Sequence, residues 1–157
     1  MPALTTTHTV AVAIAAAVIF NLIGVAISRR CAVAAASTAF QPPGQVFAVV
    51  WPVLYSILGV VFAILIRATV NRTAPTPWLV SALTLFSVQM VMNFSWMPVY
   101  SCAGKREAAL YMLVALFAVQ ATTQVVVSQV SMPATTLLAP YTAWLVFAMI
   151  LNTNQLN

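Results

Sequence analysis

The chain has 157 residues, of which 63% are hydrophobic and only 4% are charged, and its mean hydropathy is +1.03. Soluble domains carry about 25% charged residues, so this composition excludes a water-soluble globular protein and indicates an integral membrane protein. The net charge of +5 comes from basic residues scattered over three loops, which is typical of membrane-flanking charges and not of a nucleic-acid-binding patch.

All the charged residues lie between apolar runs, and five such runs are long enough to cross a bilayer. A transmembrane helix needs about 20 residues, and lipid requires every backbone polar group to be satisfied within the segment. We therefore predict an all-α membrane protein: a five-transmembrane-helix bundle that forms a single domain over residues 1–157. The predicted helices are Thr9–Ser28, Val46–Ile66, Trp78–Tyr100, Ala108–Val130 and Pro133–Asn152.

The first two predicted helices each carry a stripe of small or polar residues at helical spacing. On the first helix the stripe consists of Ala13, Ala17, Asn21, Gly24 and Ser28. On the second it consists of Trp51, Tyr55 and Gly59, with Ser56 beside them. Small residues let neighbouring helices approach closely, so we expect tight helix packing along Ala13 and Ala17. The first helix follows a short segment that contains His8 and has no basic region, which favours a retained helix over a cleaved signal peptide.

The longest connection runs from Arg29 to Gln45, and its middle, residues 31–39, is small and weakly apolar. We expect either a short amphipathic helix or a lid over the bundle here. Cys31 and Cys102 lie near the first and third loops, on the same side of the membrane. We predict two free thiols in preference to a disulfide, because two cysteines at this spacing form neither a disulfide framework nor a metal site.

The third predicted helix contains the most informative stretch, in which a carboxamide lies in the middle of an apolar run. Gln89, Asn93, Trp96 and Tyr100 are spaced by four, three and four residues, so they share one helix face. A carboxamide in hydrocarbon is costly unless it finds a partner. This face suits a bundle interior or the wall of a ligand pocket. We assign Trp78 and Tyr100, at the helix ends, to the membrane interfaces.

The fourth and fifth predicted helices carry polar stripes of the same kind. Gln120, Gln124 and Ser128 are strictly four apart, and we interpret the glutamines as links between helices, each hydrogen bond worth on the order of 1 kcal/mol. Glu107, in the first turn of the fourth helix, complements the helix dipole. Ser131 followed by Pro133 is an N-terminal helix signature. The stripe on the fifth helix consists of Tyr141, Trp144, Ala148 and Asn152.

Bulky residues with polar tips are clustered on three of these helices. Packing alone needs no such clustering, whereas an aromatic-lined cavity for a flat ligand does. The sets are Trp51 with Tyr55, Asn93 with Trp96, and Tyr141 with Trp144.

The loop charges predict an orientation in the membrane. The first and third loops carry four basic residues, whereas the second carries two. Because basic residues are more frequent in cytoplasmic loops, we expect the N-terminus outside and the C-terminus on the cytoplasmic side. The residues counted are Arg29, Arg30, Lys105 and Arg106 against Arg67 and Arg72.

Three motifs follow one another along the chain. The first is Phe40-Gln-Pro-Pro-Gly44 running into Val46-Phe47, Trp51-Pro52 and Leu54-Tyr55. The second is Gln89-x-x-x-Asn93-x-x-Trp96-x-Pro98, and the third is Pro140-Tyr141-x-x-Trp144 followed by Leu151-Asn152. Over about Gly24–Asn152 the chain resembles the translocator protein family, also called the tryptophan-rich sensory proteins, TspO/MBR or peripheral benzodiazepine receptors.

The resemblance implies a five-helix membrane receptor, often a homodimer, with a pocket that opens toward the first loop. The implied ligands are tetrapyrroles such as protoporphyrin IX and haem, sterol-like lipids, and drug-like isoquinolines and benzodiazepines, and the implied role is sensory, chaperoning or transport. No cofactor is obligatory. Carried over by motif position, the ligand-binding residues are Phe47, Ala48, Trp51, Tyr55, Asn93, Trp96, Trp144, Ala148 and Leu151.

The first loop departs from the family pattern. The family's tryptophan and Lys-Pro are absent from residues 31–40, and Gln45 replaces a tryptophan. Because the loop tryptophan is implicated in light-driven porphyrin breakdown, we do not expect that enzymatic activity. One His, one Glu and no Asp also leave almost no residues for acid–base or metal chemistry. The family's C-terminal sterol motif is absent, since no basic residue follows Leu151.

These departures leave an alternative open. In this alternative, the chain is a structural accessory subunit of a larger membrane assembly, such as a pigment-containing one. The subunit keeps the fold without the ancestral function of the first loop. An ion-coupled transporter or channel is disfavoured, because no helix interior carries an ionisable acid or base.

Overall fold

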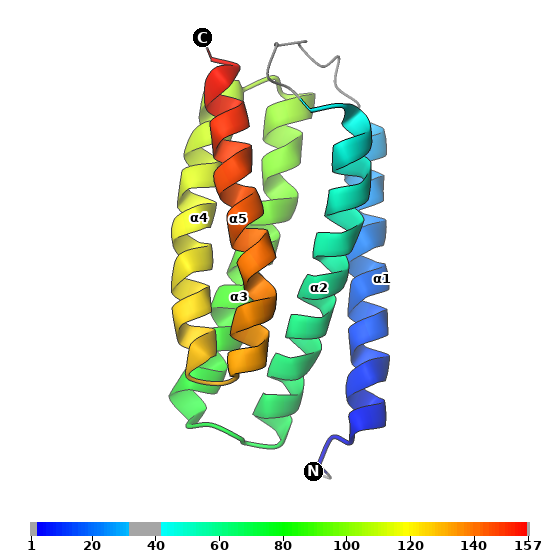
Figure 1. Ribbon diagram of the computed structural model, residues 1–157, viewed down its shortest axis with the longest axis vertical. Helices are drawn as coiled ribbons and strands as arrows, with labels where there is room; N and C mark the ends of the chain where they lie inside the picture. Colours follow the sequence, from blue (N-terminus) through cyan, green and yellow to red (C-terminus); the bar gives the residue numbers. More distant parts are fainter. Residues whose placement is uncertain (1–2, 32–41, 157) are drawn as a thin grey trace.

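The computed structural model describes residues 3–31 and 42–156, so the amphipathic helix or lid expected in the first loop lies outside the described residues beyond Cys31. Over the described part, five long helices are each apolar enough to cross a membrane, which confirms the predicted five-helix bundle. A short π-helical turn, η1, continues the third helix. The elements are α1 Thr6–Arg30, α2 Gly44–Val70, α3 Thr76–Met97, η1 Pro98–Cys102, α4 Arg106–Ser128 and α5 Met132–Asn154 (Figure 1).

Local capping explains where α1 and α5 begin. Thr5 caps α1: its hydroxyl oxygen accepts from the His8 backbone N–H, while the Thr5 N–H donates to His8 Nδ1, both at 3.4 Å. His8 was expected in the N-terminal tail and instead belongs to the first turn of α1. Ser131 caps α5 as its sequence signature predicts, accepting from the Ala134 N–H at 3.4 Å.

The helices form an antiparallel bundle with the two termini at opposite ends (Figure 1). Helix α4 packs against α3 and α5, and α2 packs against α1, α5 and α3. Helix α1 lies at the edge, where it contacts chiefly α2 and only lightly α3. The core therefore lies among α2–α5, around fully buried side chains such as Leu58, Phe86, Leu113 and Tyr141.

The seam between α1 and α2 is a close backbone approach. A Cβ atom added at Gly59 would lie 2.6 Å from the backbone nitrogen of Ala17 and 2.8 Å from its Cα. One turn further on, the Asn21 Nδ2 donates to the Ala17 carbonyl at 2.8 Å. The tight packing predicted for Ala17 is thus confirmed, and its partner on α2 is Gly59.

The seam between α4 and α5 is held by side-chain hydrogen bonds. Gln120 Nε2 donates to Thr142 Oγ1 at 3.0 Å, and the Thr142 hydroxyl donates to Gln124 Oε1 at 2.7 Å. Gln124 Nε2 donates in turn to the Thr135 carbonyl at 3.2 Å. This confirms that the two glutamines link helices.

Cys31 and Cys102 form a disulfide, which corrects the prediction of two free thiols. The two residues are 71 apart in sequence, yet their Cα atoms are 4.8 Å apart. Cys31 follows the last turn of α1 and Cys102 ends η1, so the bond joins the end of α1 to the end of the third span. Residue spacing gave no sign of this, because the pairing depends on how α1 docks beside α3.

Reduction of the disulfide is expected to destabilise the protein. A crosslink typically contributes about 2–4 kcal/mol by restricting the unfolded chain, and we expect the lower part of this range because a membrane or micelle already restricts the helices. The measurement is the melting temperature in detergent with and without a reductant. A double Cys31→Ser, Cys102→Ser variant is the control and should not respond to reductant. An unchanged wild-type melting temperature, with reduction verified by thiol alkylation, would contradict the prediction.

Candidate ligand-binding cavity

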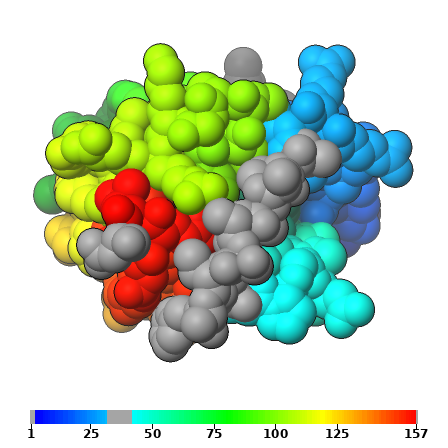
Figure 2. Space-filling view, turned by 90° about the horizontal axis from the view of Figure 1, so that it is seen from above, coloured from blue at the N-terminus to red at the C-terminus, as the bar shows by residue number. Residues whose placement is uncertain are grey.

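A cavity of about 560 Å³ lies between α1, α2, α3 and α5, at the end of the bundle that carries the disulfide and the end of α5. Figure 2 looks onto this end. Small-molecule pockets measure about 300–1,000 Å³, so the cavity has the size of a ligand site. Its lining consists of Asn21, Gly24, Val25, Ser28, Arg29, Cys31, Gly44, Phe47, Ala48, Trp51, Pro52, Tyr55, Asn93, Trp96, Met97, Tyr100, Ser101, Ala148, Leu151, Asn152 and Gln155.

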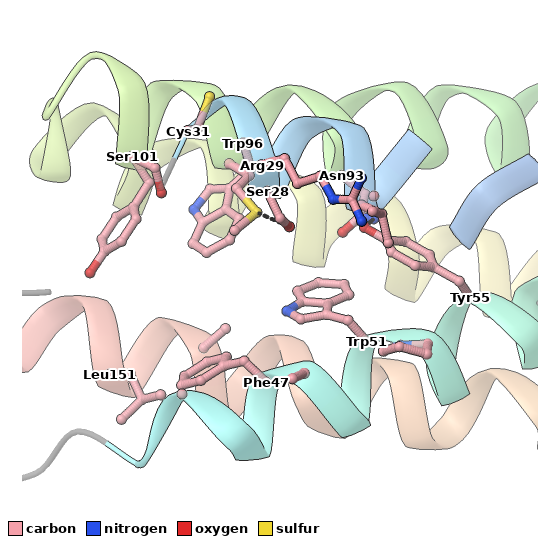
Figure 3. Close-up of a pocket in the computed structure, with 18 of the residues that line it drawn as sticks. Ser28, Arg29, Cys31, Phe47, Trp51, Tyr55, Asn93, Trp96, Ser101 and Leu151 are labelled. Atoms are coloured by element: carbon pink, nitrogen blue, oxygen red, sulfur yellow. Dashed lines mark hydrogen bonds between the residues drawn. The ribbon is translucent and has the colours of Figure 1, made fainter. Parts of the chain in front are cut away.

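Two stacked aromatic pairs stand on different sides of the cavity. Trp51 stacks on Tyr55 on α2, with ring centroids 5.3 Å apart and planes 30° apart. Trp96 on α3 stacks on Tyr100 on η1 at the same centroid distance, with planes 18° apart. Figure 3 shows Trp51 and Trp96 on facing helices, with Phe47 beside Trp51. Faces of this kind hold flat, apolar ligands by offset stacking.

The deep end of the cavity is formed by the pair Asn93 and Tyr55. Asn93 is only 3% exposed, and its Nδ2 donates to the Tyr55 hydroxyl at 3.4 Å. This bond supplies the partner that a carboxamide in an apolar helix needs. The Asn93 Oδ1 has no hydrogen-bond partner among the described residues, so it is left as an acceptor at the cavity's deep end. Gln89, one turn further from the mouth, is fully buried and does not line the cavity.

Two further lining residues have buried polar atoms without a partner among the described residues. They are Asn152, which is 2% exposed and unpaired at both carboxamide atoms, and Trp96 at Nε1. An unsatisfied buried polar group costs about 1–3 kcal/mol. Donors and acceptors left open on the wall of one cavity are therefore typical of a site that binds a molecule with polar groups or ordered water.

The mouth of the cavity is more polar than its depth. Arg29, in the last turn of α1, is the one charged side chain in the described lining. Ser28 lies beside it, and its hydroxyl contacts the Met97 sulfur at 3.8 Å. Tyr100, which lies at the end of the third span, also lines the cavity, and its hydroxyl donates to Gln155 Oε1.

Eight of the nine ligand-binding residues expected from the motifs line the cavity, and Trp144 does not. Trp144 lies behind the wall, with its ring 5.7 Å from that of Phe47 and 6.2 Å from that of Trp51, both in edge contacts. On its other side it faces a separate apolar groove between α2 and α5. Trp144 thus supports the rings that line the cavity.

Sequence reasoning did not assign α1 to the cavity wall. Four α1 residues before Arg29 line it, namely Asn21, Gly24, Val25 and Ser28. A Cβ atom at Gly24 would lie 2.5 Å from Cε2 of the Tyr55 ring, so the absence of a side chain there makes room for Tyr55. The small stripe on α1 was a usable signal, but we interpreted it only as helix packing.

Comparison with known proteins places the chain in a family. A family model described as the TspO/MBR family matches residues 6–156. The chain belongs to the TspO/MBR family. It is therefore an integral, multi-pass membrane protein. Three of its four tryptophans lie in the cavity wall or directly behind it.

Individual TspO/MBR relatives are similar over most of the chain. The Translocator proteins of Ovis aries and Sus scrofa are 32% and 35% identical over 115 residues, which are 72% of this chain and 65% of each relative. The Tryptophan-rich protein TspO of Chlorobaculum tepidum is 28% identical over 113 residues, covering 72% of this chain and 69% of its own length. The match thus spans just under two thirds of the mammalian relatives. None of the three names denotes an enzyme.

Proposed function

We propose that this TspO/MBR protein binds a tetrapyrrole such as a porphyrin in the cavity between α1, α2, α3 and α5. The observation that carries the proposal is the pairing of aromatic faces from α2 and α3 around about 560 Å³, with an open acceptor, Asn93 Oδ1, at the deep end. A flat macrocycle presents the extended π-face on which such aromatic walls stack. Binding would serve a sensory, chaperoning or transport role without catalysis.

A sterol-like lipid is the second candidate ligand, favoured by the apolar part of the lining around Phe47, Ala48 and Leu151. A sterol nucleus is flat and carries few polar groups. It would leave most of the open polar atoms of Asn93, Trp96 and Asn152 unsatisfied, and each of these costs free energy when buried. A tetrapyrrole offers the larger π-face to the Trp51–Tyr55 and Trp96–Tyr100 pairs, so the aromatic lining favours the tetrapyrrole.

A metal-free porphyrin is a sharper probe than haem. Haem iron in proteins commonly takes a histidine, cysteine or methionine ligand. The single histidine, His8, lies in the first turn of α1, far from the cavity mouth along the helix. Among the lining residues Cys31 is in a disulfide and the Met97 sulfur already contacts Ser28.

The proposal is tested by titrating the purified protein with protoporphyrin IX and following tryptophan fluorescence, since Trp51 and Trp96 line the cavity. We expect saturable quenching. Asn93→Leu keeps a similar volume but removes the open acceptor and the bond to Tyr55, and it should weaken binding about tenfold, the effect of losing one buried hydrogen bond. Asn154→Leu, an exposed position outside the cavity, is the matched control. Absence of saturable quenching in the wild type would refute the proposal.

The assembly and orientation of the chain are also part of the proposal. We infer a homodimer. The loop charges favour a cytoplasmic position for the cavity mouth and the C-terminus, whereas the Cys31–Cys102 disulfide at the same end is typical of an oxidising compartment. The alternative, an accessory subunit of a larger assembly, is favoured by the divergent first loop. Mild solubilisation and native gels separate the two: migration as a free dimer supports the homodimer, whereas co-migration with other subunits supports the alternative.

A further inference from the structure

The cavity is polarised along its length. Its deep end is formed by the rings of Trp51 and Tyr55 and the amide of Asn93. Its mouth carries the guanidinium of Arg29 in the last turn of α1, and Figure 3 shows Arg29 among the lining side chains. A ligand that complements this arrangement has an apolar, flat body and an anionic group at one edge.

Among the described residues, no acidic side chain competes for Arg29 from the cavity wall. The only acidic side chain in the sequence is Glu107, which does not line the cavity and accepts a hydrogen bond from the Tyr111 hydroxyl at 3.1 Å. The same end of the bundle also carries Arg30, Lys105 and Arg106. Clustered charges of one sign raise the local concentration of ligands of the opposite sign, so this mouth favours anions.

Comparison with Arg30 distinguishes a ligand-binding role of Arg29 from two general roles of basic residues at the end of a helix. Both arginines lie in the last turn of α1, where a basic residue complements the helix dipole and flanks the membrane. These effects apply equally to Arg29 and Arg30. Only Arg29 lines the cavity, so an effect specific to Arg29 has to come from the cavity.

We propose that Arg29 is a specificity-determining residue that binds a carboxylate of the ligand at the cavity mouth, so that the site selects carboxylated macrocycles over neutral ones. A guanidinium donates two parallel N–H bonds to a carboxylate. The Ser101 side chain, which lines the same end, supplies a further polar contact. This inference rests on the proposed function, since it names the ligand class of the same cavity.

The test compares protoporphyrin IX with its dimethyl ester, which has the same ring and no free carboxylate. Binding is measured in non-ionic detergent for the wild type, Arg29→Gln, Arg29→Lys and Arg30→Gln. We expect the wild type to prefer the acid to the ester. Arg29→Gln should weaken binding of the acid about tenfold, typical of losing a charge-assisted contact, and leave the ester unchanged. Arg29→Lys should restore part of the affinity, and Arg30→Gln should stay within about twofold of the wild type.

The outcomes distinguish this inference from the proposed function. If the wild type binds neither porphyrin, the proposed function fails. If it binds acid and ester equally and Arg29→Gln changes nothing, porphyrin binding stands and the role of Arg29 is overturned. Equal weakening by Arg29→Gln and Arg30→Gln would show general attraction to a basic surface and would also overturn it. A further experiment adds phosphatidylserine, whose headgroup carries a carboxylate. If this lipid abolishes the preference of the wild type for the acid over the ester, Arg29 binds lipid headgroups and its role toward the porphyrin is overturned.

Discussion

Replacing Trp51 with alanine is expected to weaken porphyrin binding about 30-fold, because buried aromatic anchors at binding sites typically contribute about 2 kcal/mol or more. The Trp51 ring stacks on Tyr55 and meets the edge of Trp144, so it joins the cavity wall to the support behind it. Alanine would remove the stacking face and the ring that stacks on Tyr55. Affinity is measured by the absorbance or fluorescence of the porphyrin itself, since the variant has lost one of the reporting tryptophans.

Trp78→Ala is the matched control for Trp51→Ala. Trp78 lies in the first turn of α3, is 42% exposed and does not line the cavity. The control therefore makes the same chemical change without touching the site, and its affinity should equal that of the wild type. Similar affinities for Trp51→Ala and Trp78→Ala, with both variants folded by circular dichroism, would contradict the assignment of Trp51 to the ligand wall.

Replacing Gly59 with alanine is expected to destabilise the bundle by about 1–3 kcal/mol, the usual cost of overpacking. The added Cβ atom would lie 2.6 Å from the Ala17 nitrogen and 3.0 Å from the Ala17 Cβ. Backbone atoms cannot turn aside as a flexible side chain does, so α1 must move away from α2. The measurement is the melting temperature in detergent.

Gly44→Ala supplies the control, because a Cβ atom at Gly44 meets nothing within 4 Å. It should leave the melting temperature near the wild-type value. Since Asn21 and Ser28 on α1 line the cavity, we also expect Gly59→Ala to weaken porphyrin binding. A wild-type melting temperature for Gly59→Ala would show that the seam tolerates a methyl group and would contradict the close approach of the two backbones.

The sequence alone was sufficient for the fold class and for much of the cavity's composition. Lipid excludes unsatisfied backbone groups, so five membrane-length apolar runs had to be five helices. Helical spacing placed Asn93 and Trp96 on one face, and in the structure both line the cavity. The ligand-binding residues carried over from the motifs, apart from Trp144, line the cavity, while their role in binding stays a prediction.

Only the tertiary structure decided how the helix faces meet. Spacing along one helix fixes which residues share a face, but not how far neighbouring helices rotate or slide, which depends on contacts such as that between Gly59 and Ala17. That docking brings Cys31 to Cys102 and puts Trp144 behind the wall. It also places Arg29 over the cavity and leaves Arg30, its neighbour in sequence, outside the lining. The rotation of α1 about its own axis therefore decides which of the two neighbouring arginines lines the cavity.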